Sequence, residues 1–272
     1  MNELSRKEAQ LRELVRDCSS AVVAFSGGVD SSVVAAIARE ELGEEAIAVT
    51  AVSPIYPEWD ESAAADVVKE VGIEHRKLQT DEMQDEEFVS NPEDRCYHCK
   101  RNRLREFDEL RVELGFDTIL EGTNRDDHGE YRPGMQAMEE FEDTVVSPLS
   151  EVGITKEETR ALARKLDVPT AAKPASPCLA TRIPFASLIT GTKLSRIEKA
   201  EKFLRSLGFG IVRVRDHGNL ARIEIEQERI PEAIERRTEI ANRLQEIGYS
   251  FVSLDLKGYR SGSLHAKNDD ER

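Results

Sequence analysis

A short run of glycines and serines is the part of this 272-residue sequence best suited to chemistry. The run reads Ser26-Gly27-Gly28-Val29-Asp30-Ser31-Ser32. Two glycines let the backbone turn sharply and bring its N–H groups close to an anion. A helix that follows would direct its positive end to the same point, and the serine hydroxyls add donors. The run lacks the lysine of a Walker A motif, so it predicts a different phosphate loop, with a strand–helix turn capped by serines as the alternative.

The cysteines form the second group of reactive side chains: Cys18, Cys96, Cys99 and Cys178. The N-terminal segment carries no apolar stretch typical of a secretory signal, so we expect a cytoplasmic protein with reduced thiols. In that compartment the spacing Cys96-x-x-Cys99 indicates metal binding or redox chemistry. Cys18 ends an amphipathic pattern and is predicted to be a small buried residue.

The composition limits the classes of partner. The sequence has 38 Lys and Arg against 53 Asp and Glu, a net charge of −15. A broad phosphate-neutralising face is poorly compatible with this balance, so we expect no nucleic-acid partner. No run of about eighteen apolar residues is present, so we expect no membrane span. Scarce lysine and abundant carboxylates are typical of halophilic archaea, with an ordinary acidic protein as the alternative.

The first part of the chain alternates helical and strand patterns. Helices are predicted over residues 3–17, 32–42, 58–71, 97–115 and 154–166, and strands over 21–25, 46–52, 75–80, 117–122 and 144–149. Thr155 is predicted to cap the last helix, with Glu158 three residues later. Strands separated by helices predict an α/β fold with a doubly wound parallel sheet.

The pattern changes after residue 169. Residues 169–193 are rich in proline and small residues and show no period, which is typical of a functional loop or a linker. Beyond them we predict helices over 194–207 and 230–247 and strands over 210–217, 220–226 and 250–256, with a hairpin turn at Gly218-Asn219. The sequence thus predicts a domain over residues 1–170 and a smaller α+β domain over 171–272.

The full pattern SGGxDS, between a buried strand and a helix, is similar to the pyrophosphate loop of the N-type ATP pyrophosphatases. This group includes NAD and GMP synthetases, asparagine synthetases and tRNA thiolation enzymes. The resemblance implies an adenine nucleotide α-hydrolase-like fold, ATP cleaved between its α and β phosphates, and transfer of AMP. ATP would be bound by Ser26, Gly27, Gly28, Asp30, Ser31 and Ser32. Asp30 would also hold Mg²⁺, a hard cation that prefers oxygen ligands.

Residues after two of the predicted strands complete the expected nucleotide site. In this fold a ligand lies at the carboxyl ends of the strands. Val52 follows the second strand, and Gly122 and Thr123 follow the fourth. We expect the adenine and ribose between these two strand ends.

Three further segments narrow the resemblance: residues 121–134, 174–185 and 212–224. With the loop and residues 251–262, they resemble the LarE family of ATP-dependent sulfur transferases. The resemblance implies adenylation of a carboxylate of pyridinium-3,5-biscarboxylic acid mononucleotide and its conversion to a thiocarboxylate in nickel-pincer cofactor biosynthesis. Cys178 falls at the family's sulfur-donor position, where a sacrificial cysteine becomes dehydroalanine. A buried structural thiol is the alternative for Cys178.

The pair Cys96 and Cys99 is not expected in enzymes of this family that use a sacrificial cysteine. With Cys178 the pair could hold three irons of a [4Fe-4S] cluster, whose open fourth iron binds a renewable sulfide; related three-cysteine enzymes are thought to work this way. Two alternatives remain open. The pair could form half of a zinc site with His98 or His75, or a redox pair that activates sulfur.

Three arginines are expected to bind the phosphate of the substrate. Arg213 and Arg215 alternate on one predicted strand and share a face, and Arg182 follows the predicted sulfur donor. Guanidinium groups suit a nucleotide phosphate, and the resemblance implies this role. Solvated strand charge is the alternative. Arg132 could reach either the ATP phosphates or the substrate carboxylate, and Lys100 could help to neutralise the reacting phosphates.

Other functions share parts of this pattern. A tRNA thiolation enzyme would share the loop and the cysteines, but no basic or zinc-ribbon module for tRNA is visible. An ammonia-dependent amide synthetase would need no thiol, and a nucleotide sensor would release no pyrophosphate. The preferred resemblance implies a small nucleotide-like substrate, a homo-oligomer, and a downstream nickel-insertion enzyme as partner.

Overall fold

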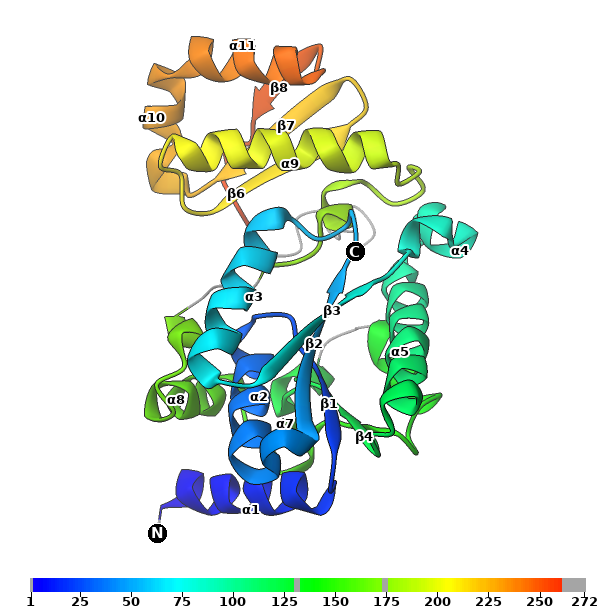
Figure 1. Ribbon diagram of the computed structural model, residues 1–272. Coiled ribbons are helices and arrows are strands. Elements are labelled where there is room, and N and C mark those ends of the chain that lie inside the picture. Colours follow the sequence, from blue (N-terminus) through cyan, green and yellow to red (C-terminus); the bar gives the residue numbers. More distant parts are fainter. Residues whose placement is uncertain (1, 130–132, 173–175, 261–272) are drawn as a thin grey trace, which may run out of the picture. The chain divides into compact units, whose positions relative to one another are not determined.

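The computed structural model describes residues 2–129, 133–172 and 176–260, which pack into two compact units (Figure 1). The first unit comprises Met1–Phe88 and Asp94–Ser176, and the second comprises Val89–Glu93 and Pro177–Arg272. The predicted boundary between a nucleotide domain and a substrate domain, after residue 170, stays a prediction. The two compact units describe how the chain packs and do not test which unit carries which function.

A five-stranded sheet with the order β3-β2-β1-β4-β5 forms the centre of the first unit. Its strands are β1 (Ala21–Ala24), β2 (Ala46–Val52), β3 (Glu74–Gln79), β4 (Thr118–Leu120) and β5 (Val145–Val146). Every pairing is parallel, so the predicted doubly wound parallel sheet is confirmed. The central strand β1 is uniformly apolar because helices cover both of its faces, whereas the edge strand β3 carries charges that meet water.

The helices along this part of the chain are α1 (Glu3–Asp17), α2 (Val29–Leu42), α3 (Glu58–Val71), α4 (Glu86–Val89), α5 (Arg95–Leu114), α6 (Pro133–Glu139), α7 (Pro148–Glu151) and α8 (Lys156–Lys165). Short 3₁₀ helices are η1 (Gly43–Glu45), η2 (Glu82–Gln84), η3 (Arg125–Gly129) and η4 (Pro169–Ala172). Helix α2 begins earlier than predicted, inside the glycine–serine run. The predicted capping box is confirmed, since Thr155 Oγ1 accepts the N–H of Glu158 at 3.1 Å and Glu158 Oε2 accepts the N–H of Thr155 at 2.9 Å.

Successive residues of β1 point to opposite faces of the sheet and so enter two different cores. Val23 belongs to a core with buried residues of α1, α2, α3 and α8. Val22 belongs to a second core with Leu104 and Phe107 of α5. The helix that carries the pair Cys96 and Cys99 therefore covers the face of the sheet opposite to α2.

The second unit is built on a three-stranded sheet with the order β6-β7-β8. Its elements are η5 (Leu179–Arg182), α9 (Gly191–Ser206), β6 (Val212–His217), β7 (Leu220–Ile225), η6 (Gln227–Arg229), α10 (Ile230–Glu235), α11 (Arg237–Ile247) and β8 (Phe251–Leu254). The predicted hairpin turn is confirmed: His217 pairs with Leu220, and Gly218 takes a φ of 74°. β8 joins β7 in parallel, which makes the sheet mixed.

The prediction of one helix over residues 230–247 is wrong. Arg236 leaves the helical conformation, with φ −90° and ψ 10°, and separates α10 from α11. Its guanidinium donates to the carbonyl oxygen of Leu207 at 3.0 Å. A contact with a residue distant in sequence thus accompanies the break, and a periodic pattern gives no sign of it.

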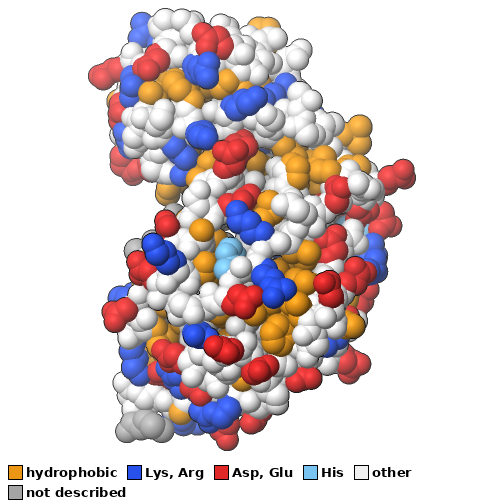
Figure 2. All heavy atoms as spheres, viewed as in Figure 1, with side chains coloured by type: hydrophobic (Ala, Val, Ile, Leu, Met, Phe, Trp, Pro, Cys, Tyr) orange, Lys and Arg blue, Asp and Glu red, His pale blue; other side chains and the backbone are white. Residues whose placement is uncertain are grey.

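Charged side chains of both signs are interspersed on the face that Figure 2 shows. Asp and Glu are not gathered into one patch there, and neither are Lys and Arg. Among the described helices, none is both long and apolar enough to cross a membrane.

A buried ion pair organises the second unit. Arg182 Nε donates to Glu201 Oε1 at 2.9 Å, and Arg182 Nη2 donates to Glu201 Oε2 at 3.1 Å. The side chains are 1% and 0% exposed. Glu201 Oε1 also accepts the N–H of Val214 at 3.0 Å. Because water does not reach either charge, each needs the other to stay in the core.

Replacing Glu201 by Gln should destabilise the protein by about 3–5 kcal/mol, because it leaves the positive charge of Arg182 buried without its partner. Chemical denaturation followed by circular dichroism measures this loss. The matched control is Glu239→Gln, whose exposed pair with Arg236 should be worth at most about 1 kcal/mol. Equal effects of the two substitutions would contradict the importance of the buried pair.

Candidate functional site

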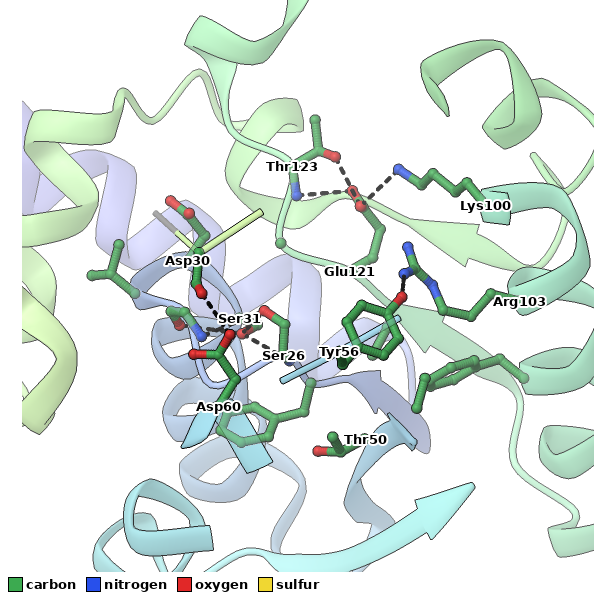
Figure 3. Close-up of a pocket in the computed structure, with 18 of the residues that line it drawn as sticks. Ser26, Asp30, Ser31, Thr50, Tyr56, Asp60, Lys100, Arg103, Glu121 and Thr123 are labelled. Atoms are coloured by element: carbon green, nitrogen blue, oxygen red, sulfur yellow. Dashed lines mark hydrogen bonds and ion pairs between the residues drawn. The ribbon is translucent and has the colours of Figure 1, made fainter. Parts of the chain in front are cut away.

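A cavity of about 380 Å³ lies in the first unit beside the carboxyl ends of β1, β2 and β4. This is where a doubly wound sheet binds ligands, and the volume suits a small molecule. Figure 3 shows Asp30 and Ser31 on one side of the cavity, with Lys100 and Arg103 on α5 across from them. Glu121 lies between these two groups.

The serines of the glycine–serine run hold the loop in shape. Ser26 Oγ lies 3.1 Å from Ser31 Oγ, and Ser31 Oγ also takes the N–H of Ser26 at 3.2 Å. Ser32 Oγ donates to the carbonyl oxygen of Gly28 at 2.7 Å and is fully buried. Of the predicted ATP-binding residues, Ser26, Gly28, Asp30, Ser31, Gly122 and Thr123 line the cavity, whereas Gly27, Ser32 and Val52 do not.

Two glycines allow the backbone to pack closely around the loop. Gly27 has a φ of 66°, and a Cβ there would lie 2.9 Å from Cα of Ala64. A Cβ on Gly122 would lie 2.9 Å from the backbone nitrogen of Ser31. Only glycine fits both positions without movement of backbone, so the loop and the end of β4 meet directly.

Asp30, at the first turn of α2, pairs with Lys156 at the start of α8. Asn124 Nδ2 also donates to Asp30 Oδ1 at 3.3 Å. The Asp30 side chain is 19% exposed and lines the cavity with Asp127. Carboxylate oxygens beside a phosphate loop are the donors that Mg²⁺ prefers, so these residues fit the predicted Mg²⁺.

Glu121 provides a buried carboxylate that holds neighbouring side chains in place at the cavity. Its carboxylate accepts the N–H of Thr123 at 2.9 Å and the Thr123 hydroxyl at 2.8 Å, and Lys100 Nζ donates to it at 3.3 Å. Burial by itself would raise the pKa of Glu121, but Lys100 and hydrogen bonds from Ser147 and Thr123 outweigh burial and lower the pKa. The ionised carboxylate thus fixes both Thr123 and Lys100 at the cavity.

Arg103 adds a third cation to the cavity, beside Lys100 and Lys156. Its guanidinium donates to the hydroxyl oxygen of Tyr56. The pKa of Arg103 is raised, chiefly by the Tyr56 oxygen, so the group keeps its charge.

Sequence reasoning missed Lys156, Glu121, Arg103 and Tyr56 as site residues. The signals were weak: Lys156 directly follows the cap of a helix, and Arg103 lies one turn beyond Lys100 on α5. On β2 the cavity is lined by Thr50 and Ala51, which precede Val52, and the ATP contact expected of Val52 stays a prediction. Arg132 lies outside the described residues.

None of the four cysteines, all of which lie in the described residues, forms a disulfide bond. Cys96 is exposed and Cys99 half-buried in the first turns of α5, in the first unit, and Cys178 is half-buried at the start of η5, in the second. The pair and Cys178 thus belong to separate units, and the proximity of the three thiols stays a prediction. Cys18 is half-buried, and burial raises the pKa of its thiol, as fits an inert packing residue.

The three predicted phosphate-binding arginines are buried, at 1%, 5% and 6% exposure for Arg182, Arg213 and Arg215. Solvated strand charge, the alternative explanation for Arg213 and Arg215, is therefore wrong. Arg215 pairs with Glu224 at 2.7 Å. Arg213 lies over the ring of Tyr259 at 5.1 Å, and no carboxylate among the described residues forms an ion pair with it.

Burial and the positive charge of Arg182 lower the pKa of Arg213. The negative charge of Glu201 acts in the opposite direction but does not outweigh them. A buried cation that forms no ion pair with a described carboxylate would gain from a bound anion. Of the three arginines, Arg213 therefore has the most to gain from a phosphate, and its predicted role in substrate binding stays a prediction.

Comparison with known proteins identifies the family. Residues 3–192 match the family model described as NAD synthase. The chain is 42% identical over 265 residues to an uncharacterized protein of Synechocystis, and the match covers 96% of this chain and 98% of that protein.

Two further relatives carry the names of enzymes. A subunit of the glutamine-hydrolyzing GMP synthase of Halorubrum lacusprofundi is 28% identical over 179 residues, 60% of this chain and 55% of the relative. Pyridinium-3,5-bisthiocarboxylic acid mononucleotide synthase of Lactiplantibacillus plantarum is 33% identical over 266 residues, 97% of this chain and 96% of the relative. The chain therefore belongs to the NAD synthase family and, within it, to the LarE family that contains this mononucleotide synthase.

Proposed function

We propose that this protein is an ATP-dependent sulfur transferase of nickel-pincer cofactor biosynthesis. It adenylates a carboxylate of pyridinium-3,5-biscarboxylic acid mononucleotide, releases pyrophosphate, and converts the acyl adenylate to a thiocarboxylate. One observation carries the proposal: the phosphate loop shares a cavity with the cations Lys156, Lys100 and Arg103. The product named for the relative from Lactiplantibacillus plantarum, aligned over nearly the whole chain, supports the choice of substrate.

The triphosphate of ATP binds at the loop. Gly28 is the N-cap residue of helix α2 and has no side chain to cap the first N–H groups. A helix start without a side-chain cap directs N–H groups and a partial positive charge to an anion. Asp30 would hold Mg²⁺, which would neutralise charge on the phosphates, and Lys156 beside it adds a further positive charge.

Adenylation then activates the substrate. A carboxylate oxygen attacks the α phosphorus of ATP, the bond to the β phosphate breaks, and pyrophosphate leaves with the electron pair. Lys100 and Arg103 stabilise the negative charge that develops on the phosphates. Their positions are held by Glu121 and Tyr56.

Sulfur transfer follows at the acyl carbon. A sulfur nucleophile forms a carbon–sulfur bond, and AMP leaves as the carbon–oxygen bond breaks. The nucleophile is the thiolate of Cys178, which becomes dehydroalanine when a base removes its Cα proton and the Cβ–S bond breaks, leaving the sulfur on the product. Alternatively, Cys96, Cys99 and Cys178 would hold a [4Fe-4S] cluster, which would supply sulfide as the nucleophile. Cysteine thiols that form no disulfide supply the donor chemistry that such a cluster requires.

A second candidate is an ammonia-dependent amide synthetase. The similarity to the GMP synthase subunit and to the NAD synthase family favours it. It shares the adenylation step, but ammonia replaces sulfur as the nucleophile. A sulfur transferase needs Cys178, whereas an amide synthetase does not.

Partners belong to the proposal as well. The product is a nucleotide-like thiocarboxylate, so the next reaction inserts nickel, and we propose a nickel-insertion enzyme as partner. We also propose that the protein acts in the cytoplasm as a homo-oligomer. We propose no nucleic acid as its partner.

Replacing Lys156 by Ala should weaken ATP binding and slow pyrophosphate release by about 10- to 100-fold, the effect of losing one charge-assisted hydrogen bond. Pyrophosphate release and ATP titration measure the two quantities. The matched control is Lys165→Ala on the same helix, whose partner Glu8 does not line the cavity. If both variants behave like the wild type, Lys156 has no part in the site.

Replacing Cys178 by Ser should leave pyrophosphate release intact and abolish the thiocarboxylate, because adenylation precedes sulfur transfer. Mass spectrometry of substrate and protein measures both products. Cys18→Ser, a change at a half-buried thiol outside the site, should keep full activity. Thiocarboxylate made by the Cys178 variant would contradict the assignment, and amide made from ammonia would favour the amide synthetase.

Iron and acid-labile sulfide distinguish the two sulfur donors. Protein purified without oxygen and reconstituted should hold about four irons per chain. Cys96→Ser should lose them, because the cluster would keep too few thiolate ligands. No iron in either protein would exclude the cluster and leave Cys178 as a donor that is used once.

A further inference from the structure

Two carboxylates and an imidazole meet at the start of α5, outside the cavity. One ligand atom from each of Asp85, Glu87 and His98 lies within 4.8 Å of the others. Asp85 and His98 are half-buried and Glu87 is exposed. Nitrogen and oxygen donors in this combination are typical of sites for divalent zinc, manganese or iron.

Helix geometry separates this group from the neighbouring thiols. An α-helix turns about 100° per residue, so Cys96 and Cys99 share one face of α5 and His98 lies on another. The described part of the chain contains no such group with a cysteine among its members. His98 therefore belongs with the carboxylates that precede the helix, and not with the thiols.

Each member of the group has a second side chain in reach. Asn102 Nδ2 donates to Asp85 Oδ2, and Arg101 Nη2 lies 2.9 Å from Glu87 Oε2. Asp94 Oδ2 lies 3.6 Å from His98 Nε2. Metal sites hold their ligands in this way, and a carboxylate behind a histidine fixes the ring so that its other nitrogen faces the ion.

The second ring nitrogen of His98, Nδ1, has no hydrogen bond to account for its buried position. His98 Nδ1 is buried and has no hydrogen-bond partner. Glu87 Oε2 lies 3.0 Å from it, close enough for an ion pair but without hydrogen-bond geometry. Two ligand atoms that are each about 2.1 Å from one ion lie roughly 3.0 to 3.4 Å apart, so this distance fits two ligands of the same metal.

We propose that Asp85, Glu87 and His98 bind a divalent cation of the zinc class. The side chains around the site carry a net charge of about −2. Three negative charges come from Asp85, Glu87 and Asp94 and one positive charge from Arg101, while a metal-bound imidazole is neutral. A divalent ion therefore balances the charge of the site. The ion joins Asp85 and helix α4, which carries Glu87, to the start of α5, the helix that carries Lys100 and Arg103. The site goes beyond sulfur transfer, since it would bind zinc even if the protein adenylated nothing.

The test is titration of Zn²⁺ against a chromophoric chelator, on the full chain with all four cysteines replaced by Ser. One zinc per chain should bind, and adding His98→Ala should weaken binding about 100-fold or more. Asp94→Asn should weaken it about 10-fold, the effect of an outer partner. The matched control His128→Ala, a histidine that contacts Ser150 elsewhere, should leave binding unchanged. No zinc in the folded thiol-free chain, or equal affinity after His98→Ala, would overturn the proposal.

A second measurement serves if the thiol-free chain does not fold. The first equivalent of Co²⁺ added to the wild-type protein should give weak visible bands without thiolate charge-transfer absorption, and His98→Ala should lose them. Charge-transfer absorption at that first equivalent would assign the ion to the cysteines and overturn the proposal.

Discussion

The close backbone contact between the phosphate loop and the end of β4 is the constraint on which the site depends. Gly122 packs its Cα where a Cβ would lie 2.9 Å from the backbone nitrogen of Ser31, and Gly27 turns with a φ of 66°. This contact brings two strand ends together, so the start of α2 and the Glu121–Lys100 pair border one cavity. Glycine at these positions is thus a requirement of geometry, and the surrounding ion pairs fix the charges around it.

Much of the first unit could be predicted because its signals are local. Apolar runs such as residues 46–52 form buried parallel strands wherever helices cover both faces, and Thr155 caps its helix through its own neighbours. The helix predicted over residues 230–247 failed for the opposite reason. Its break at Arg236 coincides with a contact to Leu207, which is distant in sequence.

Site residues that stand together in one sequence motif were predicted. Site residues that only the fold brings together were missed. The loop residues stand together in the sequence, but Lys156 reaches Asp30 only because α8 lies beside α2. Burial is equally invisible in a sequence. Arg215 looks like surface charge until the hairpin pairs its strand with the one that carries Glu224. The charged side chains of Arg182, Arg215, Glu201 and Glu224 thus form buried ion pairs inside the second unit, whereas Asp30, Lys100 and Lys156 line the cavity of the first.

Oxygen transfer tests the central claim, the formation of an acyl adenylate, most directly. Substrate labelled with ¹⁸O in its carboxylates would be incubated with ATP and the wild-type protein, and the released AMP analysed by mass spectrometry. Because a carboxylate oxygen becomes the bridge to the α phosphorus and leaves with AMP, the account predicts one labelled oxygen in AMP. Unlabelled AMP, or ADP in its place, would contradict adenylation of the carboxylate.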